Sequence, residues 1–566
     1  IATTHDLKVE DFNADRYRFK SDTQPAGIVE NQGRITVADA GLAAFVAPGV
    51  VNHGVITARL GEVTLASGNE FTVDLYGDQK INLALDNKVA KQVLGRDGKP
   101  LTALVKNDGQ IFADGGRIQI TAAAAKGIVD NVVSIGGIVQ ARSVEESNGD
   151  IVLSGEGGAV QVSGTLDASG KAAGRRGGTV SVSGNSVRVK SGARIDVSGA
   201  AGGGQALIGG DFRGGKASQA EYDQYALRPA RKPVPPAETT TVEAGAVLTA
   251  DALSSGTGGE LIVWSDGATT VKGSLTARGG AGGGDGGFIE TSGHLLNVDG
   301  ITADTKAWRG SSGTWLLDPY NVTITSSGDT ISGGGTYTPS ANSSTIDVAT
   351  LNQALTGGST VVITTGGGSG SQAGDINVIS PIVSAGSATL ALEADANIYV
   401  ANSISAHAGS SLNLILDARA NGGSYGSVSV FKKTVGGADV AINTRGGYVT
   451  IGGGADPSTT AAIGSYSSAT YNASPLDSWR GVTVNGSIDA GGGNIVINGA
   501  GCPNNLGCQY ARGVSIGGAI STSGSGSITI TGSGTVDNSG SPGSDGVALG
   551  DTRYFNYGGV TDVAGT

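Results

Sequence analysis

A short string recurs along this chain, a glycine followed by alternating apolar and polar residues. The strings GRIQI, GIVQ, GAVQV and GTVSV begin at positions 116, 137, 158 and 178, a nearly even spacing. Alternate side chains of an extended strand point to opposite faces, so each string can bury one face of a short strand. The repeat predicts that the chain winds into stacked coils of about 21 residues.

Two further repeats lie nearer the C-terminus. Ile376, Ile382 and Leu390 recur at a common offset of 22 as Ile398, Ile404 and Leu412. An Arg-Gly-Val string at residues 480–482 recurs at 512–514, and Asp-Gly-Val follows at 545–547, at offsets of 32 and 33. Ile495 and Ile528 keep the same step. We expect the coils to persist here while their loops lengthen.

The composition limits what these coils can enclose. Glycine supplies 98 of 566 residues, the hydrophobic fraction is 38%, and aromatic residues are 5%. The chain is too apolar for a disordered one, and its 14 prolines exclude collagen. Most apolar residues are Val, Ile, Leu and Ala, which suit a thin continuous core.

A leucine-rich repeat and a β-solenoid can both have a period of about 21 residues. The first needs a Leu-x-x-Leu-x-Leu frame with a helical return, whereas this chain alternates Val and Ile with Gly, Ser, Asn and Asp between strands. We therefore predict an all-β fold, a parallel β-helix rod with extruded loops. Val160, Val162, Val180 and Val182 should point inward, and Gln161 and Ser181 outward.

Residues 211–240 interrupt the pattern. The prolines at 229, 233, 235 and 236 cannot donate backbone hydrogen bonds, so this stretch cannot be an inner strand and is predicted to be an extruded loop. Loops positioned by a rigid scaffold often carry binding residues. The candidate contact residues are Tyr222, Tyr225, Arg228, Arg231 and Lys232.

The charge balance excludes some functions. The 37 basic and 49 acidic residues give a net charge of −12, without a basic stripe, so nucleic-acid binding is disfavoured. No run reaches the roughly 18 apolar residues of a membrane span, and residues 1–10 do not resemble a signal peptide. The absence of an initiator methionine suggests a mature or internal fragment.

The two cysteines, Cys502 and Cys508, are six positions apart around a Pro-Asn-Asn turn. This spacing suits a small loop closed by a disulfide, which indicates an oxidising compartment. Two thiols without partner histidines make a poor zinc site.

Several strings resemble a known family, the exoproteins of bacterial two-partner secretion, which include filamentous haemagglutinin and the high-molecular-weight adhesins. They are DFNADRYRF at residues 11–19, NQGRI at 31–35, NHGVI at 52–56, GEVTLA at 61–66, GGDF at 209–212, VWSD at 263–266, GGAGGGDGGFIETSG at 279–293 and GTWLLDPYNVTI at 313–324. The two Asn-x-Gly-x-Ile strings are related by an offset of 21, so stacked asparagines at a coil corner also explain them.

The resemblance covers about residues 6–324 and implies a secreted or surface protein of a Gram-negative bacterium. It implies export by an outer-membrane transporter that recognises an N-terminal secretion domain with Asn-Pro-Asn motifs. The sequence contains no Asn-Pro-Asn, so we expect it to begin within or just after that domain. The expected divisions are 1–90, the end of a secretion-domain-like β-helix; 91–324, a β-helix with the Gly-rich repeats; and 325–566, a β-helix with longer coils and the cysteine loop 502–508.

Some enzymes with parallel β-helices cleave glycans, and their chemistry leaves a recognisable pattern. Such enzymes need clustered carboxylates or a calcium site together with a base. The acidic residues are scattered singly at turns such as Asp167, Asp196, Asp299 and Asp489, and the four histidines have no metal-ligand spacing. We predict no catalytic residue, no metal and no cofactor.

Two other residue classes have a structural and a functional interpretation. Trp264, Trp308 and Trp315 could present aromatic surfaces to sugars, but tryptophan more commonly covers the end or corner of a thin core. Asn321, Asn342, Asn472 and Asn485 begin Asn-x-Ser/Thr sequons and are candidate glycosylation sites, although chance supplies some in a chain of this composition.

The sequence therefore predicts a non-catalytic adhesin-type exoprotein for attachment and display. Its partners would be glycans or proteins of host cells, other bacteria or the matrix, bound by many weak contacts. One alternative is a protein that self-associates into an extracellular fibre or biofilm matrix. Another is a stalk that binds a haem carrier or delivers a toxin.

Overall fold

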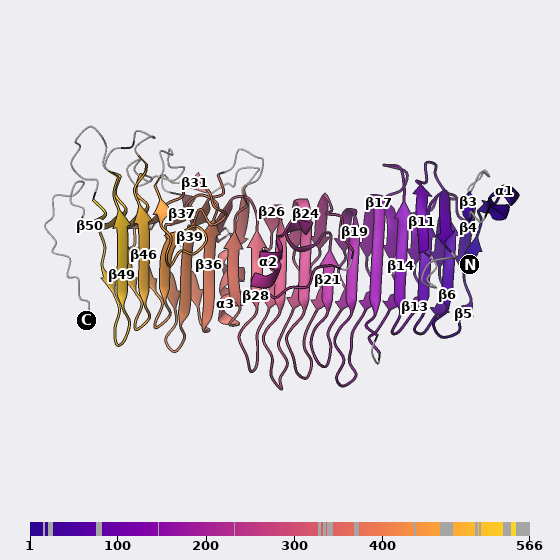
Figure 1. Ribbon diagram of the computed structural model, residues 1–566, viewed down its shortest axis with the longest axis horizontal. Coiled ribbons are helices and arrows are strands. Elements are labelled where there is room, and N and C mark those ends of the chain that lie inside the picture. The colour runs from indigo at the N-terminus through magenta and orange to yellow at the C-terminus, as the bar shows by residue number, and fades with distance from the viewer. Residues whose placement is uncertain are drawn as a thin grey trace. The chain divides into compact units, whose positions relative to one another are not determined.

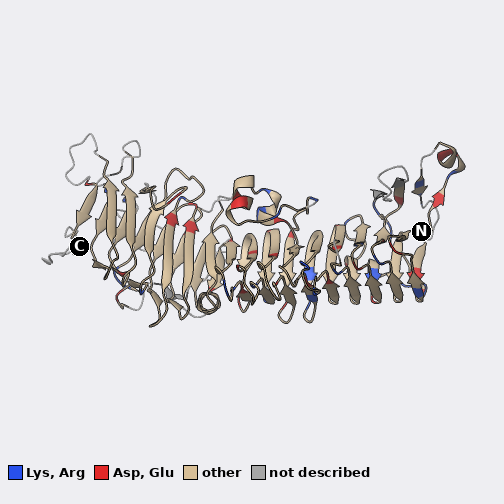
Figure 2. Cartoon of the chain, turned by 60° about the horizontal axis from the view of Figure 1, so that its bottom comes forward, with Lys and Arg blue, Asp and Glu red and all other residues tan. Residues whose placement is uncertain are grey.

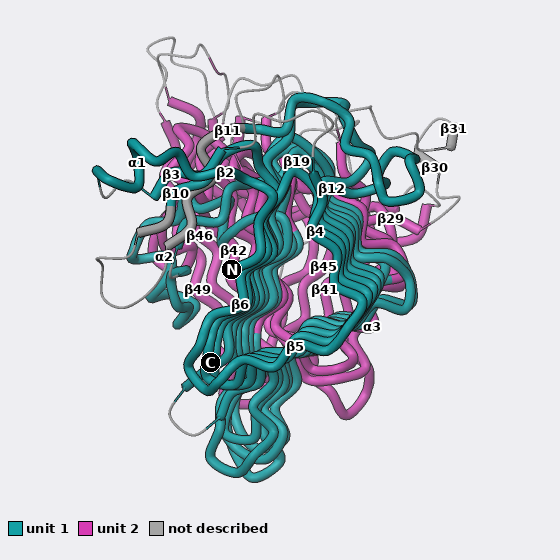
Figure 3. The backbone as a smooth tube through the Cα atoms, turned by 90° about the vertical axis from the view of Figure 1, so that its right-hand side faces the viewer, with its two compact units in different colours: residues 1–291, 301–313 teal, residues 292–300, 314–566 magenta. Residues whose placement is uncertain are grey.

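The structure is a computed structural model. It describes residues 1–14, 17–20, 27–74, 82–144, 147–230, 232–326, 330–331, 335–336, 343–366, 373–434, 437–464, 479–503, 508, 511–535 and 545–550. The chain forms two compact units. Unit 1 contains residues 1–291 and 301–313, and unit 2 contains residues 292–300 and 314–566 (Figure 3).

Unit 1 is built from three columns of parallel strands, which form the three sides of each coil. Figure 1 shows strands of successive coils side by side, and Figure 3 shows the coils end-on. The first column contains β4 (Ile28–Asn31), β7 (Gly49–Asn52), β12 (Ala103–Asn107), β15 (Asn131–Ile135), the second halves of β17 (Asp150–Val162) and β19 (Thr179–Val189), β22 (Thr239–Val242) and the second half of β24 (Glu260–Val271).

The second column is a nine-stranded sheet of three-residue strands: β5 (Arg34–Thr36), β8 (Val55–Thr57), β13 (Gln110–Phe112), β16 (Ile138–Gln140), β18 (Thr165–Asp167), β20 (Arg194–Asp196), β23 (Val247–Thr249), β25 (Ser274–Thr276) and β27 (Thr302–Asp304). The third contains β1 (Ala2–Thr3), β6 (Leu42–Ala47), β9 (Glu62–Ser67), β14 (Arg117–Ala123), the first halves of β17, β19 and β24, and β21 (Gln205–Ile208). β26 (Phe288–Asn297) begins in unit 1 and ends in unit 2.

Smaller elements flank these columns. β2 (Asp6–Leu7), β3 (Arg18–Lys20), β10 (Glu70–Asp74) and β11 (Asn82–Asn87) form an antiparallel sheet. The short helix α1 (Val9–Asn13) lies between β2 and β3 in the sequence, and α2 (Gln219–Gln224) lies between β21 and β22.

The strands alternate as the sequence predicts. Val160, Val162, Val180 and Val182 are fully buried, whereas Gln161 and Ser181 between them are partly exposed. Because the paired strands are parallel and in register, the inward side chains of one coil lie directly over those of the next. The predicted fold class, a parallel β-helix, is confirmed.

In unit 1, the predicted period of about 21 residues is correct only near the N-terminus. Ile28 pairs with Gly49 at an offset of 21, but Arg117 pairs with Asp150 and Asp150 with Thr179, at offsets of 33 and 29. GIVQ lies in the second column and GAVQV in the first, while GRIQI and GTVSV share the third column two coils apart. The even spacing of these four strings therefore relates strands on different sides of the coil, and not equivalent strands of successive coils.

The expected asparagine corner is present and extends further than the two strings indicated. Asn31 donates through Nδ2 to Asn52 Oδ1 at 2.8 Å, and Asn52 donates in the same way to Asn107 Oδ1 at 2.6 Å. All three side chains are buried. These hydrogen bonds satisfy polar groups that would otherwise be costly to bury.

A second corner of unit 1 is a column of glycines without side chains. It contains Gly41, Gly61, Gly116, Gly149, Gly178, Gly204, Gly259, Gly287 and Gly313. A Cβ on Gly259 would lie 2.1 Å from the Gly204 carbonyl oxygen, which accepts a hydrogen bond from the N–H of Glu260. The backbones of successive coils are therefore too close here for any side chain.

Unit 2 also winds through three columns. One contains β29 (Val322–Thr325), β34 (Ile376–Val378), β37 (Ile398–Val400), β40 (Val428–Val430), β44 (Val482–Val484), β47 (Val514–Ile516) and β50 (Val547–Leu549). The second contains β35 (Ile382–Ser384), β38 (Ile404–Ala406), β41 (Ala441–Asn443), β45 (Ser487–Asp489) and β48 (Ile520–Ser521).

The third column of unit 2 contains β28 (Thr314–Asp318), β33 (Thr360–Thr364), β36 (Ala388–Ala394), β39 (Leu412–Ala418), β42 (Val449–Gly453), β46 (Ile495–Ala500) and β49 (Ile528–Ser533). Short additions are β30 (Thr330–Ile331), β31 (Gly335–Thr336), β32 (Ser344–Asp347) and β43 (Ala462–Ile463).

The repeats predicted in this half are mostly in register. Ile376 pairs with Ile398, Ile382 with Ile404, and Ile495 with Ile528. The Val482, Val514 and Val547 series also stacks as predicted. Leu390 instead pairs with Leu414, so its predicted match to Leu412 is wrong: the turn between β38 and β39 is two residues longer than the preceding one.

One coil of unit 2 contains a helix, which the sequence repeats do not indicate. α3 (Val348–Thr356) contacts β35, β32, β33 and β36. The Asp347 side chain accepts from the N–H of Ala349 at its N-terminus, and Val348, Leu351, Ala354 and Leu355 are buried at helical spacing. The helix thus covers the core next to β35.

Candidate functional site

Residues 209–238, which we call the strap, leave the coil after β21 and return at β22. The strap contains a short 3₁₀ turn at Phe212–Gly215 and the helix α2, which begins at a capping box between Ser218 and Glu221. Figure 2 shows a helical segment outside the coils, at the middle of the chain. The expected excursion from the coil is present, but it is a folded segment packed on strands.

Aromatic rings attach the strap to the coil. Phe212 is fully buried, with its ring centroid 5.2 Å from that of Tyr222 and 5.6 Å from that of Phe288 on β26. Tyr225 also packs on Phe288, at 5.1 Å. Edge-on and tilted ring pairs of this kind add to the free energy gained from burial.

Trp264 on β24 lies against two strap glycines. A Cβ on Gly210 would lie 2.6 Å from Trp264 Cδ1, and a Cβ on Gly214 would lie 2.8 Å from Cε2. Gly214 also has a φ of +66°, which favours glycine. The indole is thus covered by backbone, which leaves no room for a sugar ring on that face.

Two buried carboxylates of the coil hold the strap by charge. Glu260, 6% exposed, accepts from Arg228 Nε at 2.9 Å and from Gln205 Nε2 at 2.8 Å. Glu290, fully buried, accepts from the backbone N–H of Arg213 at 3.3 Å. Breaking either contact would remove one donor from a buried carboxylate.

A third carboxylate belongs to the strap itself. Burial raises the pKa of Asp211, although the Phe212 N–H and the Tyr222 hydroxyl bond to it and act in the opposite direction. Burial, followed by the charges of Asp211 and Glu290, raises the pKa of Tyr222 to about 12. The phenol therefore stays protonated and can donate to Asp211.

The predicted contact residues have different environments. Tyr222 is 8% exposed and packs on Phe212, so its prediction as a surface contact is wrong: its ring is needed under the strap. Tyr225 is half-buried, and Arg228 is tied to Glu260. Lys232 is exposed, and Arg231 lies outside the described residues.

The cluster joins three of the strings singled out in the sequence. GGDF supplies the strap residues 209–212, VWSD supplies Trp264, and the string at 279–293 supplies Phe288 and Glu290. The intervals between these strings match no repeat offset, so only the tertiary structure shows that they meet.

The other two tryptophans behave differently. Trp315 is fully buried on β28, as expected for a residue that covers a thin core. Trp308 is 65% exposed, with Lys306 Nζ 5.3 Å from its ring centroid. The expectation that it covers the core is therefore wrong, because it lies on a loop beyond β27.

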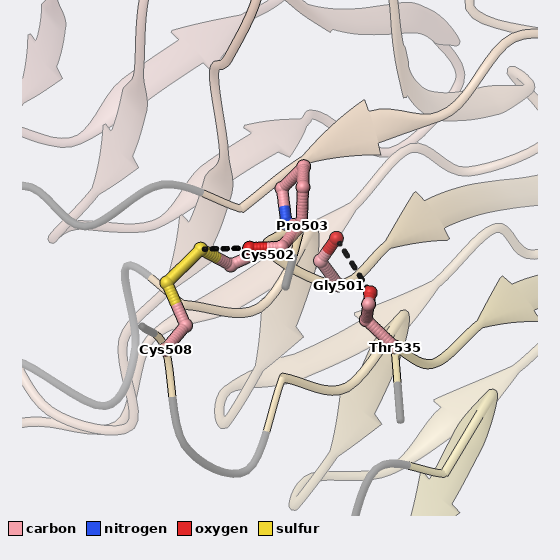
Figure 4. Close-up of a disulfide and its surroundings, with 5 residues drawn as sticks. All are labelled: Gly501, Cys502, Pro503, Cys508 and Thr535. Carbon is pink, nitrogen blue, oxygen red and sulfur yellow. Dashed lines mark hydrogen bonds between the residues drawn. A yellow bond between two sulfur atoms is a disulfide. The ribbon is translucent and has the colours of Figure 1, made fainter. Parts of the chain in front are cut away.

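The cysteines form the expected bond. The structure joins Cys502 and Cys508 in a disulfide (Figure 4). Both are buried and pack with Ala511 and Trp479, and the Cys502 N–H donates to the Trp479 carbonyl at 2.9 Å. Residues 504–507 between them lie outside the described residues.

Two candidate sequon residues are described. Asn321 accepts through Oδ1 from the N–H groups of Gly374 and Asp375, at 2.7 and 2.9 Å, which makes its side chain part of a corner. Asn485 is half-buried in the turn between β44 and β45. Asn342 and Asn472 lie outside the described residues.

The expectation of singly scattered acids is wrong for two pairs of described residues, Asp167 with Asp196 and Glu393 with Asp417. Asp167 and Asp196 lie side by side in adjacent coils. Each is neutralised: Arg142 Nε lies 2.8 Å from Asp167, and Lys171 Nζ lies 2.9 Å from Asp196. These ion pairs favour a structural role for the two carboxylates at a corner of the coil. Across the described part of the chain, no three His, Cys, Asp or Glu side chains are grouped to hold a metal ion.

The helices among the described residues are short. None of them is long and apolar enough to cross a membrane.

Comparisons with known proteins identify a structural neighbour. No family model and no curated protein matches the chain. Among solved structures, the chain is similar to the HMW1 secretion domain from Haemophilus influenzae, with 29% sequence identity and a TM-score of 0.42. The match covers 56% of this chain and 73% of that one.

Proposed function

We propose that this chain is a non-catalytic adhesin-type exoprotein, secreted by or displayed on a Gram-negative bacterium. Its ligands are glycans or proteins of host cells, other bacteria or the matrix. Its export partner is an outer-membrane transporter of the two-partner-secretion class. The observation that carries the proposal is the meeting of three strings that resemble this family, around Phe212, Trp264 and Phe288, in the docking site of one strap.

The display of side chains supports many weak contacts. Ile138, Thr165 and Arg194 follow one another in register on the second column, at the strand spacing of about 4.8 Å. A surface that offers adjacent contact points at short intervals gains avidity from simultaneous binding. The docked strap adds an exposed basic residue, Lys232, on a fixed support.

The proposal is tested by attaching the purified chain to beads and measuring adhesion to epithelial cells, bacteria and immobilised glycans. Binding that rises steeply with bead coating density supports a multivalent adhesin. Absence of binding to every surface, or turnover of a bound glycan, would contradict the proposal.

A matched pair of variants tests the strap. If the strap contacts the ligand, Lys232→Ala weakens adhesion. Lys272→Ala removes the same charge from an exposed position outside the strap and should leave adhesion unchanged. Equal behaviour of the two variants would place the contact elsewhere on the chain.

A further inference from the structure

Three oxygen-bearing side chains form a row on the outer face of unit 2. Thr364 on β33 pairs with Glu393 on β36, and Glu393 pairs with Asp417 on β39. The neighbours along these strands, such as Ile363, Leu392 and Leu416, are fully buried and point inward, so the row points outward. Figure 2 shows acidic residues on two adjacent strands of this unit.

Two members of the row each have a buried oxygen without a partner. Thr364 is 3% exposed and Asp417 6% exposed. Thr364 Oγ1 and Asp417 Oδ1 are inaccessible to solvent and have no hydrogen-bond partner. A buried carboxylate oxygen without a donor is costly and uncommon, and it indicates a missing cation or proton.

The surrounding charges do not satisfy Asp417. Burial, with a further contribution from the Glu393 carboxylate, raises the pKa of Asp417 to about 8, while the Gly454 N–H and Arg419 act weakly in the opposite direction. Arg419 donates through Nη1 to the Gly423 carbonyl at 3.0 Å. Asp456 accepts from the Ser458 N–H and hydroxyl at 2.9 and 2.6 Å. Arg419 therefore offsets the burial of Asp417 only in part, and Asp456 adds to the negative charge around it.

The scarcity of charge in unit 2 makes this pairing unusual. This unit holds only 7 of the 37 basic residues and 16 of the 49 acidic ones. Two of those few acids occupy neighbouring register positions on one face, one strand spacing of about 4.8 Å apart. Like charges placed directly opposite destabilise a sheet unless something between them compensates.

We propose that a calcium ion binds between the carboxylates of Glu393 and Asp417, with water oxygens as its further ligands. Ca²⁺ fits because it accepts carboxylate, hydroxyl, carbonyl and water oxygens in a flexible shell. Zn²⁺ does not fit, because it requires three or four closely placed nitrogen, sulfur or carboxylate ligands. Mg²⁺ fits less well, because it gives up its waters reluctantly.

The test is calcium titration of the full chain by calorimetry after treatment with a chelator. With two carboxylates we expect one site with a Kd of about 10⁻⁴ to 10⁻³ M, the range of weak extracellular modules. Asp417→Asn and Glu393→Gln should abolish it. Asp439→Asn is the matched control in unit 2, because Asp439 is exposed and paired with Lys433.

Thermal unfolding provides a second readout that a merely structural carboxylate would not give. In chelator, Asp417→Asn should melt above the wild type, because it removes the cost of protonating this carboxylate or of burying its charge. Added Ca²⁺ should raise the thermal unfolding midpoint of the wild type but not that of Asp417→Asn. The difference between the two midpoints should therefore narrow or reverse. The proposal is overturned if the wild type takes up no Ca²⁺ at millimolar concentration, or if Asp417→Asn binds it equally well. Proton release near pH 8 without calcium uptake would instead assign the row to a shared proton.

Discussion

At the scale of single residues, the corners of the coils in unit 1 are built either from stacked side chains or from glycines, which have none. One corner stacks the amides of Asn31, Asn52 and Asn107, so that each side chain meets its equivalent in the next coil. Next to it, glycines let the backbones touch. A Cβ added to Gly54, Gly109 or Gly137 would lie 2.0, 2.2 or 1.9 Å, respectively, from the carbonyl oxygen of the equivalent glycine in the preceding coil.

Gly54 and Gly33 provide a matched test of this contact. An added Cβ on Gly54 would overlap the Gly33 carbonyl oxygen, whereas one on Gly33 would meet nothing closer than 4.0 Å. We expect Gly54→Ala to lower the free energy of unfolding by about 3 kcal/mol, because rigid backbone must move. Gly33→Ala should change it by less than about 1 kcal/mol. Urea unfolding followed by circular dichroism measures both, and equal effects would contradict the close contact.

At the scale of elements, the strap is held mainly by side chains that come much later in the chain. Phe288 and Glu290 belong to β26, well beyond the end of the strap in the sequence, so its docking waits until β26 is in place. The described residues of the strap are also short of backbone pairing, because no strand runs through them between β21 and β22. Its attachment therefore depends on a few buried contacts.

Loss of the Phe212 ring should detach the strap. Truncating a buried phenylalanine typically costs about 3–5 kcal/mol, and here that cost is borne by local docking. In Phe212→Ala, limited trypsin digestion should cut at Arg213 and Lys216 while the coils stay resistant. Phe12→Ala, at a ring that is 57% exposed, should leave the digestion pattern unchanged. A resistant strap in Phe212→Ala would show that the ion pairs are sufficient.

The cysteine loop makes a second prediction at this scale. The disulfide joins two positions separated by only 6 in the sequence, so the chain-entropy contribution is small, about 2 kcal/mol. Reduction, or replacement of both cysteines by alanine, should lower the free energy of unfolding of unit 2 by that amount. Urea unfolding with and without reductant measures it. Identical curves would mean that the packing around Trp479 holds the loop without the bond.

At the scale of the whole molecule, charge is divided unequally. Unit 1 holds 30 basic and 33 acidic residues, many of them paired at corners, as Arg278 is with Asp251 at 2.6 Å. Unit 2 is sparsely charged and relies on apolar stacking. One carboxylate in each unit should therefore respond to pH in the opposite direction to the other.

Asp196 in unit 1 and Asp417 in unit 2 carry this difference. Burial tends to raise the pKa of Asp196, but the Ser198 hydroxyl and N–H and the Lys171 ammonium outweigh it and hold the pKa below 3.8. Its stabilising contribution is present above pH 4 and is lost as the pH falls through the lowered pKa. The pKa of Asp417 is raised to about 8, so its contribution is present below pH 4 and is lost as the pH rises from about 4 to about 8.

In calcium-free buffer, the stability of the wild type relative to Asp417→Asn should fall between pH 4 and pH 8, by at most about 1.4 kcal/mol per pH unit. Asp196→Asn should be destabilised at pH 7 and approach the wild type below pH 3. Urea unfolding at a series of pH values measures both. A pH-independent difference for Asp417→Asn would contradict the burial of that charge.

The sequence by itself determined the coil. Alternating valines such as Val180 and Val182, and glycines at turns, are local signals, and they predict short parallel strands around a thin core whatever lies between them. The asparagine pair and the repeats at 482, 514 and 547 were predictable because the chain between the repeats has nearly constant length. Asn107 was not, because residues 68–102 separate it from Asn52.

Only the tertiary structure decided which strands stack, where the strap docks and which acids are neighbours. Loop lengths vary from coil to coil, so spacing in the sequence does not give the side of the coil, as the strings at 116, 137 and 158 show. The contacts of Phe212 with Phe288, and of Glu393 with Asp417, follow from register across strands, and register is set by packing of the whole coil.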